Sequence, residues 1–107
     1  MPEYLKVVWH HSLPHEPTNL YSEVVGDREV RKVEVYADGR ATIASESIET
    51  GDTRLSETPM PSLAEIARDP QFTPTRITGK EFEAVWLRAV RGEREDSGYF
   101  PRFCSRK

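Results

Sequence analysis

The sequence predicts an α+β domain in which an antiparallel sheet packs against helices from the C-terminal half of the chain. Charged and apolar side chains alternate through residues 28–44 and break at Asp38 and Gly39, which is typical of a β-hairpin with one buried face. Later in the chain, apolar residues recur at the spacing of an amphipathic helix: Phe82, Val85, Trp86, Ala89 and Val90. We therefore expect a four- or five-stranded antiparallel β-meander with two C-terminal helices packed on one face.

The first two strands are expected at residues 4–10 and 20–25. Between them, Pro14 and Pro17 indicate a loop, because proline lacks the N–H group that a strand ladder needs. A two-residue turn at residues 26–27 leads into the next strand. This turn predicts three cross-strand pairs: Val24 with Glu29, Ser22 with Arg31, and Leu20 with Val33.

The turn at residues 37–39 decides the register of the following pair of strands. A two-residue turn would send Ile43 to the outer face, whereas a three-residue turn with Gly39 in the left-handed conformation pairs Ile43 with Val33. We favour the three-residue turn, because a slip of one residue exchanges the two faces of a strand. A short fifth strand is expected near residues 53–57.

Both helices begin with a capping box, in which a cap residue and a glutamate three positions later bind each other's backbone N–H groups. Ser62 and Glu65 form the first box, which starts a short helix. Thr78 and Glu81 form the second, which starts the main helix at residues 79–91. The apolar face expected beneath the main helix comprises Leu5, Val7, Trp9, Leu20, Val33, Val35 and Ile43.

Length and composition bound the class of protein. A chain of 107 residues with 36% hydrophobic and 31% charged residues suits one polar domain, which we place at residues 1–92, followed by a basic, aromatic-containing tail at 93–107. The sequence predicts no membrane span and no signal peptide, so we expect a cytoplasmic protein. Residues 1–87 hold nine Lys and Arg against fifteen Asp and Glu, so we expect no nucleic-acid binding by the folded part.

The predicted tail combines Tyr99, Phe100 and Phe103 with arginines. It is expected either to bind a partner or a second copy of the domain, or to fold back onto the domain's own core. The single cysteine, Cys104, excludes an internal disulfide, and we expect its thiol to be incidental.

The segments LKVVWHH, LYSE, EVRKVEVYADGR and KEFEAVW together resemble a family of small bacterial proteins described as a domain of unknown function. The resemblance covers about residues 1–90. It implies the limits of the domain and supplies no activity and no catalytic residues.

Two groups of residues are candidate sites. The predicted outer face of the sheet carries aromatic and basic side chains that either hold a ligand by stacking or only cover one another: Tyr4, Lys6, Tyr21, Lys32, Tyr36 and Arg40. The loop after the first strand carries side chains that suit a transition metal, although neighbours on a strand point to opposite faces: His10, His11, His15 and Glu16. We expect neither a bound metal nor another cofactor.

The sequence predicts no catalytic residues, because no nucleophile with its base and no phosphate-binding loop is apparent. Three functional interpretations remain. The first, which we favour, is an acidic binding module of the inhibitor or immunity type that masks a basic protein partner. The second is a homo-oligomeric structural protein that associates through a sheet edge or the tail. The third is a metal- or ligand-dependent enzyme that uses residues 10–15.

Overall fold

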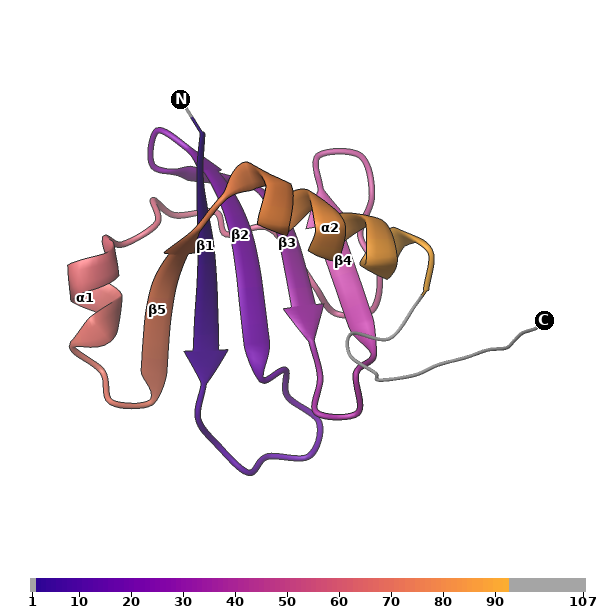
Figure 1. The fold of residues 1–107 in the computed structure, drawn as a ribbon, viewed down its shortest axis with the longest axis horizontal. Helices are drawn as coiled ribbons and strands as arrows, with labels where there is room; N and C mark the ends of the chain where they lie inside the picture. Colours follow the sequence, from indigo (N-terminus) through magenta and orange to yellow (C-terminus); the bar gives the residue numbers. More distant parts are fainter. Residues whose placement is uncertain (1, 93–107) are drawn as a thin grey trace.

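A computed structural model describes residues 2–92 and shows five antiparallel strands with two helices (Figure 1). The strands are β1 (Pro2–Trp9), β2 (Asn19–Val25), β3 (Arg28–Val35), β4 (Ala41–Ser45) and β5 (Phe72–Ile77). The helices are α1 (Leu63–Ala67) and α2 (Gly79–Val90). The predicted α+β class with an antiparallel sheet is therefore confirmed. The predicted tail and Cys104 lie outside the described residues.

The strand order is β4-β3-β2-β1-β5, so the fifth strand pairs with β1 at the edge opposite β4. We expected the fifth strand near residues 53–57, which was wrong, because that segment forms no strand and crosses the sheet as a loop. The actual strand contains Pro74 opposite Val7. A proline is tolerated there because β5 is an edge strand with one side free of ladder hydrogen bonds.

The register between β3 and β4 follows from the turn at Gly39. The N–H of Tyr36 donates to the carbonyl of Arg40 at 2.8 Å, and Gly39 has a φ of 89°. Val33 consequently lies opposite Ile43, as the three-residue turn predicts. Both side chains are buried.

The register between β2 and β3 differs from the prediction beyond the first pair. Val24 does lie opposite Glu29, but the ladder shifts by one residue directly afterwards. Ser22 therefore pairs with Lys32, and Tyr21 rather than Leu20 pairs with Val33. The cause is a β-bulge, which places one extra residue on β3 and exchanges the faces of everything beyond it.

The shift places different side chains beneath α2 from those predicted. The core cluster under α2 comprises Tyr21, Val33, Val35, Ile43, Phe82 and Val85. The predicted members Leu5, Val7, Trp9 and Leu20 lie on the opposite face, because side chains alternate along a strand. Both faces of the sheet thus carry apolar residues, and both need a cover.

The two helices cover different faces, contrary to the prediction that both pack on one. Figure 1 shows α2 crossing the sheet, whose strands β1 to β4 it contacts, whereas α1 lies beside β5. Ile66 of α1 lines a cavity with Val7 and Leu20 on the face away from α2. One short helix and the loop before it cover part of this second face.

Both capping boxes form as predicted. Ser62 and Glu65 cap α1, and Thr78 and Glu81 cap α2. At the other end of α2, Val90 belongs to the predicted apolar stripe but is 54% exposed, because the helix has passed the last strand there. None of the helices within residues 2–92 is both long and apolar enough to cross a membrane.

Candidate functional site

The structure does not bring the predicted tyrosine and cation residues onto one exposed face. Tyr21 is 4% exposed in the core beneath α2, because the bulge turns it inward. Tyr4 packs on Phe82 with ring centroids 5.4 Å apart. Lys32 lies on the opposite face, where its ammonium donates to the carbonyl of Arg54 at 2.8 Å. The prediction that these tyrosines and cations share one exposed face of the sheet was therefore wrong.

Two pairs from that set remain in contact. The guanidinium of Arg40 lies 4.6 Å from the ring centroid of Tyr36, as the predicted turn requires. The ammonium of Lys6 lies 5.8 Å from the ring centroid of Tyr21. In both pairs the cation covers the ring of its partner tyrosine, so neither of these two rings offers an open stacking surface.

The histidine loop does not assemble a metal site among the described residues. His11 accepts the N–H of Leu13 on Nδ1 at 2.9 Å and donates from Nε2 to the carbonyl of Pro17 at 2.8 Å. Both ring nitrogens are thus engaged. His10 bonds Thr73 at 2.7 Å, and no group of three His, Cys, Asp or Glu side chains within residues 2–92 is placed to hold an ion. The weak candidates His15 and Glu16 both lie exposed in the loop.

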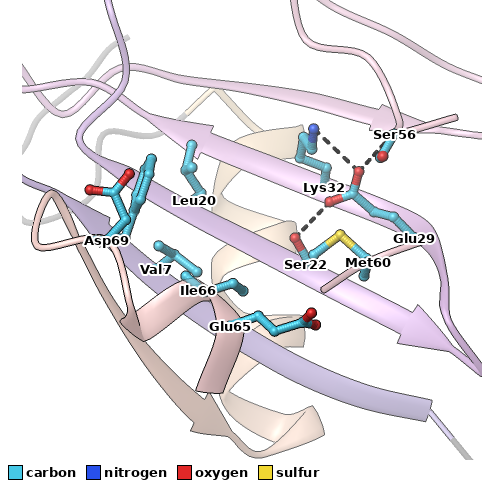
Figure 2. Close-up of a pocket in the computed structure, with 11 residues that line it drawn as sticks. Val7, Leu20, Ser22, Glu29, Lys32, Ser56, Met60, Glu65, Ile66 and Asp69 are labelled. Carbon is cyan, nitrogen blue, oxygen red and sulfur yellow. Dashed lines mark hydrogen bonds and ion pairs between the residues drawn. The ribbon is translucent and has the colours of Figure 1, made fainter. Parts of the chain in front are cut away.

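A cavity of about 250 Å³ lies between the sheet and the α1 side of the chain (Figure 2). Its apolar lining comes from the sheet and from the covering segment: Val7, Leu20, Met60, Ile66 and Phe72. Two carboxylates on the covering side, Glu65 and Asp69, also line it. The cavity therefore combines an apolar floor with an anionic rim.

Glu29 forms the polar end of this cavity, although its side chain is only 2% exposed. Its carboxylate accepts hydrogen bonds from the Ser22 hydroxyl at 2.6 Å and from the Ser56 N–H at 2.8 Å. The Lys32 ammonium lies 3.2 Å away and balances the charge (Figure 2). Glu29 therefore fastens the covering segment to the sheet.

A second cavity, of about 400 Å³, adjoins the first and shares Met60 and Glu65 with it. It continues along the same face of β1 and β2 over Leu5 and Val24. We call the two adjoining cavities the groove. Its lining contains five carboxylates, namely those of Glu3, Asp27, Glu29, Glu65 and Asp69.

Among the residues that the structure describes, only two cations line the groove, and both are already paired. Lys32 pairs with Glu29, and Arg76 lies 3.7 Å from Glu3. Within residues 2–92, Asp27, Glu65 and Asp69 have no cationic partner. The groove therefore offers unneutralised negative charge beside apolar surface.

The opposite face carries a second charged cluster, which is part of the packing. Arg31 forms ion pairs with Glu23 on β2 and with Glu83 on α2, and the hydrogen bond to Glu83 is the main cause that raises the pKa of Arg31. The same bond lowers the pKa of Glu83. Burial, together with the neighbouring Glu23, raises the pKa of the Tyr4 hydroxyl. This cluster fixes α2 to the sheet.

The groove was not predicted from the sequence, because Lys32 was placed on an exposed outer face and Glu29 was given no role. Glu29 follows Arg28 and Lys32 follows Arg31, so neither position reads as buried in the printed sequence. The available signal was the second set of apolar residues on alternate positions, Leu5, Val7 and Leu20, which requires a cover of its own.

Residues 3–91 match a family described as a domain of unknown function (DUF6881). The chain belongs to this family. The match confirms the resemblance to a domain of unknown function, and the DUF6881 domain includes every residue that lines the groove. A search of the curated proteins and a search of the solved structures each returned no match.

Proposed function

We propose that this protein is a small acidic binding module that holds a basic segment of a protein partner in the groove. The observation that carries the proposal is the combination of an apolar floor with three carboxylates that have no cationic partner within residues 2–92. Apolar contact supplies affinity, and the carboxylates select for cations. A reducing, cytoplasmic setting for this binding forms part of the proposal.

The chemistry of the groove defines the ligand more closely. A ligand with an apolar anchor fits over Val7, Leu20 and Ile66, where it removes water from apolar surface. A lysine or arginine beside that anchor reaches Glu65 or Asp69 at the rim. The best ligands therefore alternate apolar and cationic side chains along an extended segment.

A labelled eight-residue peptide of alternating lysine and leucine tests the proposal, with fluorescence anisotropy of the full chain as the readout. We expect binding that weakens between 50 and 500 mM salt, because exposed charges are screened. A peptide with glutamate in place of lysine should not bind. A peptide with serine in place of leucine should bind more weakly, because it lacks the apolar anchors.

Matched substitutions test whether the lysine–leucine peptide binds in the groove. The double variant Glu65→Gln with Asp69→Asn keeps a side-chain acceptor for the Ser62 N–H and for the Gln71 N–H and removes two charges. It should weaken binding of the lysine–leucine peptide about 3- to 30-fold. The control double variant Glu16→Gln with Glu46→Gln removes two exposed charges outside the groove and should leave binding unchanged. Equal effects of the two variants, or no binding by the parent chain, would contradict the proposal.

A further inference from the structure

We infer that residues 97–107 of a second copy of this chain occupy the groove. The inference rests on the proposed function, because it names the ligand of the same groove. The partner is then another molecule of the same protein, and the binding module becomes part of a self-association.

The composition of this segment matches the chemistry of the groove. Residues 97–107 contain three aromatic side chains, three cationic side chains and no carboxylate side chain: Tyr99, Phe100, Phe103, Arg102, Arg106 and Lys107. The aromatic residues supply the apolar anchors, which are rigid and bury large areas. Arg102 lies between Phe100 and Phe103, and Arg106 and Lys107 follow them. These cations complement the charges of Asp27, Glu65 and Asp69, which line the groove.

Pro101 adds to this match. A proline disfavours the helical conformation of the residue before it, so Phe100 is biased toward an extended backbone before binding. An extended segment is the form that fits along the direction of β1, over Leu5 and Val7. The bias reduces the conformational entropy lost on docking.

The position of Gly92 favours binding of residues 97–107 to the groove of a second copy over binding to the groove of their own chain. Gly92 follows α2, which covers the face of the sheet opposite the groove. A chain would have to descend through two layers of roughly 10 Å each and then pass beneath at least two strands of about 4.8 Å spacing. Tyr99 is seven residues beyond Gly92, a reach of about 25 Å at most. This reach is shorter than that path, so the segment with all three of its aromatic side chains fits the groove of a second copy better than that of its own chain.

Light scattering of the full chain over a range of concentrations tests the inference. We expect the mean mass to rise above the 12.3 kDa of one chain as concentration increases, and to fall again at 500 mM salt. The triple variant Arg102→Glu, Arg106→Glu and Lys107→Glu should move association to at least 10-fold higher concentration. The variant Phe100→Ser with Phe103→Ser should do the same, and neither variant alters the described domain. A mass of one chain at every concentration overturns the inference.

A competition experiment separates this inference from the proposed function. A synthetic peptide of residues 97–107 with Cys104→Ser should displace the lysine–leucine peptide from the full chain, and the Glu65→Gln, Asp69→Asn variant should bind it more weakly. If the lysine–leucine peptide binds in the groove and the 97–107 peptide does not displace it, the inference is wrong and the proposed function stands. If neither peptide binds, both are wrong.

Discussion

The guanidinium carbon of Arg31 on β3 lies 4.9 Å from the ring centroid of Trp86 on α2, and also 4.9 Å from that of Phe82. The same guanidinium donates hydrogen bonds to Glu23 on β2 and to Glu83 on α2. A single side chain thus contacts two rings and two carboxylates. It joins the helix to the sheet where the core reaches the surface.

Replacement of Arg31 by alanine should lower the free energy of unfolding by about 2–4 kcal/mol, because the rings lose a cation and the largely buried Glu23 loses its partner. Glu83 is half exposed and contributes less to this loss. Arg31→Lys should recover only part of it, since an ammonium keeps the charge but cannot bind both carboxylates as a planar fork. Urea unfolding followed by tryptophan fluorescence measures the difference.

The exposed Arg28→Ala, on the same strand, is the matched control. It should change the free energy of unfolding by less than about 0.5 kcal/mol, as most surface substitutions do. If Arg31→Ala costs no more than Arg28→Ala, the cluster around Arg31 contributes nothing to stability.

Acidification should destabilise the protein through two glutamates of α2. The hydrogen bond from Arg31 lowers the pKa of Glu83, and the backbone N–H of Thr78 lowers the pKa of Glu81. A folded pKa below the unfolded value means that the stabilisation is fully present above about pH 5 and is lost as pH falls through the lowered folded values. Denaturant unfolding at several pH values from 6 down to 2 measures this loss.

A single substitution isolates the contribution of Glu83 to this pH dependence. Glu83→Gln removes a carboxylate whose pKa is lowered, so the remaining loss of stability between pH 5 and pH 2 should be smaller than in the parent chain. Glu46→Gln is the control, because this exposed residue has no ion pair within residues 2–92. An unchanged pH profile in Glu83→Gln would exclude the proposed contribution.

The parts of the fold that depend on local signals were predictable from the sequence. Thr78 and Glu81 specify a helix start through their own side chains, and Gly39 specifies a turn through its left-handed backbone. The register between β3 and β4 follows from that turn alone. Each of these signals acts within a few residues, which is why the printed sequence displays it.

The parts that depend on distant contacts were not predictable in the same way. The bulge between β2 and β3 has no glycine or proline to mark it, yet it moves Tyr21 into the core and leaves Leu20 on the other face. The groove depends on this shift, because Ser22, Glu29 and Lys32 meet on one face only after it. A single unmarked residue therefore decided both the core and the candidate site.

Removal of the Glu29 carboxylate should loosen the segment that covers the groove. Glu29→Ala leaves the Ser22 hydroxyl, the Ser56 N–H and the Lys32 ammonium without their shared acceptor. Unpaired groups of this kind should cost about 2–4 kcal/mol of the free energy of unfolding. The amide of Ser56 should also lose its protection from hydrogen exchange, because its acceptor is gone.

Comparison of Glu29→Gln with Glu29→Ala shows whether the charge or the shape of Glu29 holds the covering segment in place. Glu29→Gln keeps an acceptor for the Ser56 N–H and a similar volume but removes the carboxylate that balances the charge of Lys32. Its cost should therefore lie between those of the parent chain and Glu29→Ala. The lysine–leucine peptide should bind Glu29→Ala more weakly than the parent, because Ser56 and Met60 belong to the groove that Glu29 holds in place. Full protection of the Ser56 amide in Glu29→Ala would mean that the segment is held by other contacts.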